Sequence, residues 1–404
     1  MKPRKIKRNH SFRRRSPFHH AVFPWKTVLG TLALIALVVG GVFTAKWLAS
    51  RVPAEYPSAS LPAESGGVTE PTAGPTGPTE PEQPTLSAER AFYVPVSALR
   101  DLTGLEKTLR QAADAGFGAM VFDLKDETGR IWYASASASA AKAKSVAADA
   151  LTAEQLSAVR ALCEGRGIVP VPRRYAFRDQ VGAENMQAAR VQYTGDPSVI
   201  WLDDYYERGG KPWLNPYSTE AQTYLTDLIA ELRTQGFARL MLSGVQFPEK
   251  TYYAYFGSST QPKGEVLSAF VQAARTAFGD GTVVLQMPAA AAMGTDTTAF
   301  GDNPLNFGEA TAAVQVIPSE LAKNLKVGEA VIADPAAQPA ETVRRIYEQI
   351  GARLRLMEEK KRPALQLWIA EDTYAAETVR SLAETDGVVL YSADGVYDFP
   401  RYER

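Results

Sequence analysis

Histidine and cysteine are almost absent from this 404-residue chain. The three histidines, His10, His19 and His20, all lie within the first 20 residues, and Cys163 is the single cysteine. Residues 89–404 therefore contain no histidine, which excludes a Ser-His-Asp or Cys-His triad there and a zinc site built from His or Cys. One cysteine cannot form an internal disulfide. Any chemistry in this region must come from carboxylates, hydroxyls, Lys, Arg or Tyr.

Basic charge is concentrated at the amino terminus. Of the 44 Lys and Arg, nine lie in residues 1–26, which leaves 35 in the rest of the chain against all 45 Asp and Glu. This mildly acidic remainder argues against nucleic acid as the principal partner. The sequence also lacks GxxxxGK, a GxGxxG after a strand, and an EF-hand-like loop. We therefore expect neither a cofactor nor a metal site.

A charge-free run of 19 residues, 27–45, follows the basic segment 1–26. It is about long enough to cross a hydrocarbon core of roughly 30 Å, and it is longer than the apolar region of a cleaved signal peptide. The preceding basic residues place the amino terminus in the cytoplasm. Residues 46–88 hold eight prolines among Thr, Ser, Gly and Glu, a composition typical of a disordered linker. We expect a single-pass transmembrane helix, a linker, and one extracytoplasmic domain over residues 89–404.

Short apolar runs alternate with amphipathic helices in residues 89–404. Eight runs are predicted to be strands: 91–96, 118–127, 168–177, 239–246, 282–288, 312–318, 364–370 and 387–392. Six helices are predicted: from 102, from capping boxes at Thr152 and Thr219, and around 263–277, 341–360 and 373–384. Residues 329–335 are interpreted as an extended loop segment. This arrangement favours an α/β fold of the (β/α)8 barrel type, TIM-like, over an open doubly wound sheet.

In such a barrel the functional site lies at the carboxyl-terminal ends of the strands. Alternation along residues 119–125 directs Asp123 and Lys125 into the barrel, where the two side chains could pair. The pair could serve the site, or it could be a structural ion pair that closes the barrel. The same alternation brings three further side chains to the mouth: Arg173, Gln366 and Tyr391. Aromatic residues gather on the loops 201–213 and 251–257, as in sugar-stacking platforms or in loops that pack on a rim.

Three stretches resemble one known family: "VFDLKDETGRIWYAS" (121–135), "PRRYAFRD" (172–179) and the block 201–237 that contains "WLNP". The "RPALQLW" of 362–368 adds to the resemblance. The family comprises bacterial envelope proteins, long catalogued as a domain of unknown function and predicted to be glycoside hydrolases with (β/α)8 barrels. The resemblance implies a polysaccharide or peptidoglycan-type glycan as partner. Its "WLNP" block adds two residues to the candidate substrate-binding set: Trp213 and Asn215.

The chain departs from the family pattern where the family carries acids. Ser243 falls at the position of an acid and Gln246 at that of an arginine, and the strand 282–288 also ends without an acid. Glycosidases usually need two carboxyl groups across the scissile bond. The carboxylates best placed to replace them are Asp123 and Glu249. Without a histidine in the domain, Ser243 has no evident base to activate it.

These observations predict a membrane-anchored, extracytoplasmic, glycoside-hydrolase-like protein that acts on or binds cell-envelope or extracellular polysaccharide, with impaired or lost catalysis. Two alternatives remain open. The protein could be an active glycosidase that uses the relocated carboxylates Asp123 and Glu249, or an envelope scaffold that binds no glycan.

The expected topology can be tested on intact protoplasts. Protease added from outside should release a soluble fragment that begins within residues 46–88, because this linker would be exposed and unfolded. Immunoblotting with an antibody against the domain would detect the fragment. Full protection of residues 89–404 under these conditions would refute the topology.

Overall fold

The computed structural model describes residues 89–382 and 386–403. The expected transmembrane helix 27–45 and linker 46–88 lie outside the described residues. Within them, no helix is both long and apolar enough to cross a membrane.

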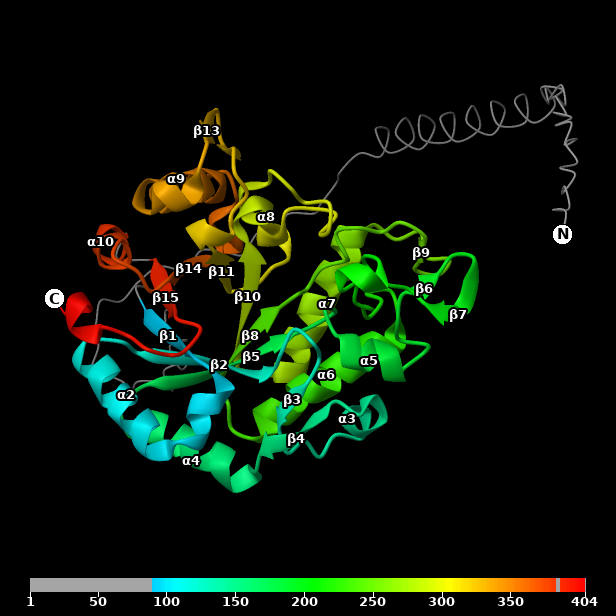
Figure 1. The fold of residues 1–404 in the computed structure, drawn as a ribbon, viewed down its shortest axis with the longest axis horizontal. Coiled ribbons are helices and arrows are strands. Elements are labelled where there is room, and N and C mark those ends of the chain that lie inside the picture. Colours follow the sequence, from blue (N-terminus) through cyan, green and yellow to red (C-terminus); the bar gives the residue numbers. More distant parts are fainter. Residues whose placement is uncertain (1–88, 383–385, 404) are drawn as a thin grey trace, which may run out of the picture. The chain divides into compact units, whose positions relative to one another are not determined.

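Eight parallel strands form a closed barrel (Figure 1). They are β1 (Arg90–Val94), β2 (Ala119–Lys125), β5 (Val169–Tyr175), β8 (Arg239–Ser243), β10 (Thr282–Pro288), β11 (Thr311–Gln315), β14 (Ala364–Ala370) and β15 (Gly387–Tyr391). They are ordered β1-β15-β14-β11-β10-β8-β5-β2, and the pairing of β1 with β2 closes the ring. Each coincides with a predicted strand, so the expected (β/α)8 barrel is confirmed.

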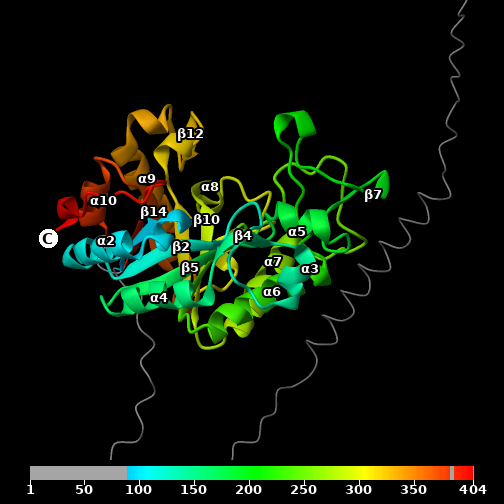
Figure 2. The same ribbon diagram turned by 60° about the horizontal axis from the view of Figure 1, so that its bottom comes forward.

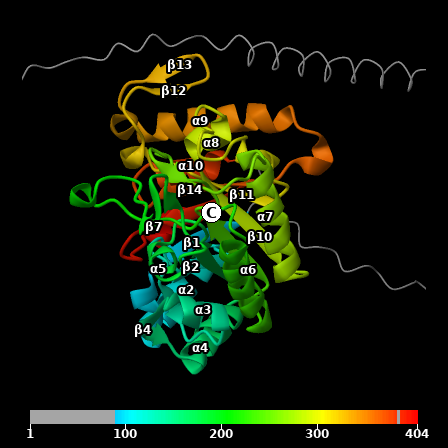
Figure 3. The same cartoon turned by 90° about the vertical axis from the view of Figure 1, so that its right-hand side faces the viewer.

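Helices follow most of the strands and cover the outside of the barrel. The longer ones are α2 (Leu102–Asp114), α4 (Ala153–Glu164), α6 (Thr219–Thr234), α7 (Lys263–Phe278) and α9 (Pro339–Arg355). The shorter ones are α3 (Ala138–Ala143), α5 (Gln180–Asn185), α8 (Ala289–Met293) and α10 (Ala375–Ser381). Figure 3 shows α6 and α7 side by side along one flank of the barrel.

Only one of the two expected capping boxes is present in the structure. Thr152 and Gln155 form the complete box at the start of α4. At α6 the N-cap is Ser218, not Thr219, because the Ser218 side chain accepts the hydrogen bond from the backbone N–H of Ala221. The helix expected over 341–360 ends at Arg355, and a 3-10 turn over Glu359–Lys361 leads into β14.

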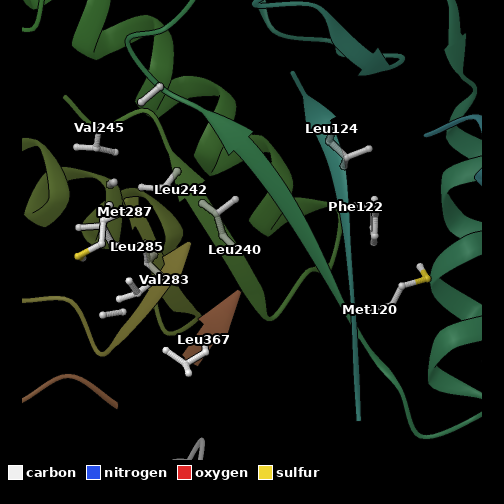
Figure 4. Packing of buried hydrophobic residues seen from close by; sticks show 14 of the residues in the cluster. Met120, Phe122, Leu124, Leu240, Leu242, Val245, Val283, Leu285, Met287 and Leu367 are labelled. Atoms are coloured by element: carbon white, nitrogen blue, oxygen red, sulfur yellow. The ribbon is translucent and has the colours of Figure 1, made fainter. Parts of the chain in front are cut away.

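Strand alternation sorts the barrel side chains into two layers. One set points outward and packs against the helices; Figure 4 shows part of it, including Met120, Phe122, Leu240 and Leu285. The other set fills the barrel interior: Ala91, Ala119, Val121, Val171, Met241, Val284, Ala313 and Val389. Cys163 belongs to the outer layer on α4, and burial raises the pKa of its thiol to about 12. The single thiol is therefore protonated and inert at neutral pH.

Three smaller sheet segments extend from the barrel. β3 (Ile131–Tyr133) and β4 (Val146–Leu151) continue the sheet beyond β2. β12 (Leu325–Val327) pairs with β13 (Ala330–Ile332), so part of the expected loop segment 329–335 is a hairpin strand outside the barrel. A three-stranded sheet combines β6 (Gln192–Tyr193), β7 (Asp196–Ile200) and β9 (Ala254–Tyr255) (Figure 1). Its strands come from the two loops that follow β5 and β8, and Figure 2 shows β7 standing away from the barrel.

Lys125 does not pair with Asp123, which corrects the expected arrangement. A bulge between Asp123 and Lys125 shifts the register of β2 against β5 and turns Lys125 out of the barrel interior. There its ammonium forms a fully buried salt bridge of 2.8 Å with Asp179 and donates to the carbonyl of Tyr175 at 2.7 Å. Gly129, at φ 93°, passes so close to Asp179 that any side chain at position 129 would clash with the carboxylate. The ion pair is therefore structural.

Glu309 is a buried carboxyl just before β11. Its side chain is 4% exposed, and neither of its oxygens has a hydrogen-bond partner within the described part of the chain. Burial disfavours the charged form and raises the pKa of Glu309 to about 7. The folded protein therefore holds a proton that the unfolded chain releases above pH 4.5.

This burial predicts that the domain loses stability as the pH rises. The contribution of Glu309 is fully present below its unfolded pKa of about 4.5 and is lost as the pH rises through about 7, amounting to roughly 3 kcal/mol. Denaturant unfolding at pH 5 and pH 8 should show a smaller difference for Glu309→Gln than for the wild type. Exposed Glu359→Gln serves as the control. An unchanged difference in Glu309→Gln would contradict the prediction.

Candidate functional site

A cavity of about 640 Å³ opens at the carboxyl-terminal ends of the barrel strands. Every barrel strand contributes at least one side chain to its wall; one from each, in chain order, is Tyr93, Asp123, Arg173, Ser243, Gln286, Gln315, Trp368 and Tyr391. The loops after β2, β5 and β8 add further polar groups at the rim. The cavity thus occupies the position at which (β/α)8 barrels carry their ligand sites.

Asp123 and Arg173 form a bidentate ion pair at the cavity floor. Arg173 Nε donates to Asp123 Oδ1 at 2.6 Å, and Nη2 donates to Oδ2 at 3.0 Å. The Tyr93 hydroxyl donates to the same Oδ2 at 2.8 Å. Both Asp123 and Arg173 are less than a tenth exposed. Both oxygens of this buried carboxylate are therefore engaged by hydrogen bonds from other residues of the protein.

Aromatic rings surround the Arg173 guanidinium. Its central carbon lies 4.7 Å from the Trp368 ring centroid, 5.1 Å from that of Tyr93 and 5.2 Å from that of Tyr175. These are cation–π distances, and they fix the planar guanidinium from several sides. Burial, and next the Asp123 charge, raise the pKa of Tyr93, so its hydroxyl remains a proton donor. Burial also raises the pKa of Tyr175 and Tyr391.

Neutral polar groups continue the network onto β8 and β10. Arg173 Nη1 lies 3.4 Å from Gln286 Oε1, and the Ser243 hydroxyl donates to the same oxygen. Gln286 Nε2 is buried and has no hydrogen-bond partner among the residues the structure describes. The wall of the cavity beside the ion pair therefore consists of an amide and a hydroxyl, and neither group ionises near neutral pH.

The remaining carboxylates of the cavity lie at its rim. Asp126 accepts bonds from Thr128, Arg130 and Trp132, and Glu127 pairs with Arg178 at 3.2 Å. Glu320 accepts a bond of 2.9 Å from Gln315. Glu249 is exposed and has no hydrogen bond or ion pair with any other described residue. In residues 89–382 and 386–403 no cluster of three or more His, Cys, Asp and Glu side chains could hold a metal ion.

The cavity brings together six of the ten residues selected from the sequence. These are Asp123, Arg173, Ser243, Gln246, Glu249 and Tyr391. Four lie elsewhere: Lys125, Trp213, Asn215 and Gln366. Lys125 leaves the barrel interior at the β2 bulge. Gln366 precedes Trp368 by two residues on β14, so it points inward one layer below the cavity, and Trp368 takes the position at the mouth.

Trp213 and Asn215 support the loops rather than line the cavity. Trp213 is buried with Val191 and Trp201 in a small separate core, and its Nε1 donates to Asp203 at 2.9 Å. The Asn215 amide donates to the carbonyl of Phe256 at 3.1 Å, joining the loop after β5 to the loop after β8. The "WLNP" motif is thus a structural anchor for both loops.

The cavity residues that escaped the sequence reasoning include Tyr93, Gln286 and Trp368. The alternation that selected Arg173 also directs these side chains inward, as the second-to-last or third-to-last residues of their strands. Applying it to every strand end would have found them. The sequence did not indicate which inward-pointing residue of each strand lies level with the barrel mouth.

Comparison with known proteins assigns the chain to a family. The family model described as "Putative glycosyl hydrolase domain" (DUF4015) matches residues 91–386, which cover the whole barrel up to the start of β15. The chain therefore belongs to this glycosyl-hydrolase-like family, as the resemblance in the sequence implied. No match was found among curated proteins.

Solved structures with a similar course of the chain share little sequence with it. A hypothetical protein from Ruminiclostridium thermocellum ATCC 27405 is 19% identical, with a TM-score of 0.42, over 48% of this chain and 96% of the other. The catalytic domain of β-amylase from Paenibacillus polymyxa is 10% identical, with a TM-score of 0.45, over 79% and 95%. A chitobiase from Flavobacterium johnsoniae is 10% identical, with a TM-score of 0.48, over 79% and 48%.

The ion pair at the cavity floor can be measured by a double-mutant cycle. Asp123→Asn leaves a buried guanidinium without its charged partner and should lower the free energy of unfolding by about 3 kcal/mol. Arg173→Met should cost a similar amount, and the double variant less than the sum of the two, because no buried charge remains. Denaturant unfolding gives all three values. Asp149→Asn, which breaks the exposed pair with Arg100, is the control and should change little. Additive effects at Asp123 and Arg173 would contradict the pairing.

Proposed function

We propose that the domain binds a polysaccharide chain in the barrel-mouth cavity and that its capacity to hydrolyse glycosidic bonds is impaired. The proposal is based on the hydrogen bonds and neighbours of Asp123. Both of its oxygens are engaged by Arg173 and Tyr93, and its neighbours across the cavity are Ser243 and Gln286.

The composition of the cavity supports carbohydrate as the ligand. Sugars present apolar ring faces together with hydroxyls, so they are bound by aromatic rings combined with directional polar groups. Trp368, Tyr391 and Tyr175 supply rings in the wall, while Gln286 and Gln315 supply amides. The family assignment agrees with this class of ligand.

Impaired hydrolysis follows from the lack of a suitable proton donor among the side chains beside Asp123. Glycoside cleavage needs one carboxylic acid to protonate the leaving oxygen and one carboxylate on the opposite side. Both oxygens of Asp123 already accept hydrogen bonds from Arg173 and Tyr93, so this carboxyl is not free to protonate a leaving oxygen. Ser243 and Gln286 have no acidic proton near neutral pH, and no histidine exists in the domain to assist them.

An active glycosidase is the second candidate, and one observation favours it. Glu249 lines the same cavity as Asp123 and has no partner among the described residues that would fix its charge. In this mechanism Glu249 would be the proton donor and Asp123 the charged group. Glu249 is exposed at the rim, and no contact within the described part of the chain holds its carboxyl in place across from Asp123, which argues against this role.

We further propose that the glycan belongs to the cell envelope or the extracellular matrix, and that the protein is a single-pass membrane protein with the domain outside the cytoplasm. Support comes from the sequence, in the basic segment 1–26 and the charge-free run 27–45 that follows it. A peptidoglycan-type chain or another envelope polysaccharide fits this location.

Binding and hydrolysis are separable in one set of assays. Calorimetric titration of the purified domain with soluble envelope and plant polysaccharides should detect binding, and Tyr391→Ala should weaken it about tenfold, because Tyr391 is a partly exposed ring of the cavity wall. Few or no new reducing ends should appear over hours. Exposed Val396→Ala is a control that should retain the wild-type affinity. Robust turnover that disappears in Glu249→Gln would establish the second candidate instead.

A further inference from the structure

The three-stranded sheet β7-β6-β9 displays tyrosines on a rigid support. Four of them form the feature we call the tyrosine platform: Tyr193, Tyr252, Tyr253 and Tyr255. Tyr252 is 80% exposed and Tyr253 71%, far more than large aromatic residues usually are in a folded domain. The rings of Tyr193 and Tyr253 lie 5.8 Å apart between centroids, so β6 and the turn that precedes β9 contribute to one aromatic surface.

A small core holds the platform in place. Val191, Trp201 and Trp213 are buried together beneath the sheet. The indole of Trp201 donates to the carbonyl of Tyr252 at 2.8 Å, and the backbone N–H and hydroxyl of Thr194 both donate to the carbonyl of Tyr253 at 2.8 and 2.9 Å. The backbone that carries the two most exposed rings of the platform is therefore fixed by buried or paired groups.

Tyr253 also adopts an unfavourable backbone conformation. Its φ is 59°, in the left-handed region that residues with a side chain rarely occupy. Strain of this kind persists only where surrounding contacts impose it, and it concentrates at functional sites. A loop that merely connected β8 to α7 would have no need to hold a tyrosine in this conformation and direct its ring to solvent.

The platform follows the rim of the barrel-mouth cavity closely along the chain. Gln246 and Glu249 line the cavity, and Tyr252 follows Glu249 by three residues, at most about 10 Å along an extended backbone. The salt bridge of 2.7 Å between Lys250 and Asp204 joins this loop to the loop after β5. A chain that leaves the cavity over this part of the rim meets the platform next.

We propose that the tyrosine platform is a second binding surface for the same glycan, so that the protein recognises a polymer chain rather than a single sugar unit. The cavity holds one or a few units, and the exposed rings stack on units further along the chain. Tyrosine suits this role because it offers a large amphipathic face with little conformational entropy to lose. This inference rests on the proposed function, since it takes the cavity ligand to be a glycan.

Glycan length is the variable that tests the inference. The probes are peptidoglycan glycan strands freed of their peptides and the disaccharide unit prepared from the same strands, both titrated into the purified domain. The strands should bind at least about tenfold more tightly, because two linked contacts add their free energies. Tyr252→Ala combined with Tyr253→Asn should remove this gain and leave the disaccharide affinity unchanged. Asn is chosen at position 253 because it tolerates the left-handed conformation.

Two controls separate ring stacking from damage to the fold. Tyr252→Phe combined with Tyr253→Phe keeps both rings and should keep the gain for strands. Leu356→Ala removes an 87% exposed apolar side chain outside the platform and should have no effect on either probe.

Four outcomes would overturn the inference. Equal affinity for strands and disaccharide, or a gain that survives loss of both tyrosines, would contradict the platform and leave the cavity proposal intact. Failure of both probes to bind would refute the peptidoglycan-type ligand itself. If the tyrosine variants lost binding to an envelope protein while retaining the gain for strands, the platform would be a protein-binding surface.

Discussion

The ion pair of Asp123 and Arg173 determines what the rest of the cavity can do. It places a carboxylate and a guanidinium inside a parallel barrel whose interior is lined mainly by apolar side chains, and each charge is tolerable only because the other is present. Tyr93 on β1, Tyr175 on β5 and Trp368 on β14 complete the enclosure of the guanidinium. The carboxylate that family resemblance and strand geometry both select is thereby committed to a protein partner before any ligand arrives.

A second ion pair explains why the family motifs lie where they do. Lys125 is the last residue of β2, and Asp179 caps α5 just after the end of β5. One pair therefore joins β2 to β5 inside the barrel, and the other joins the end of β2 to the segment that follows β5 outside it. The motif residues are in large part the means by which two strands are held in register, which is why a motif match indicates fold more directly than catalysis.

Much of the fold was predictable because it depends on periodicity. Eight apolar runs separated by amphipathic helices give one architecture, and alternation within a run identifies inward side chains such as Asp123 and Arg173. Two site residues were predicted wrongly because the local strand geometry departs from what regular inward and outward alternation indicates. A one-residue bulge redirected Lys125, and the depth of β14 placed Trp368 instead of Gln366 at the mouth. Trp213 and Asn215 were selected from the resemblance to the family's "WLNP" block, and a sequence motif alone cannot separate a side chain that lines a site from one that supports a loop.

The direction of the strands also has a consequence for attachment. β1 begins at Arg90 on the amino-terminal face of the barrel, opposite the cavity, and the Arg90 guanidinium donates to the carbonyl of Tyr402 at 2.8 Å. The two ends of the domain thus lie within one side chain's reach of each other. Joining them through a short linker and reopening the chain in a distant loop should preserve the barrel. A tag or surface tether placed at residue 90 would leave the mouth unobstructed and point it away from the support.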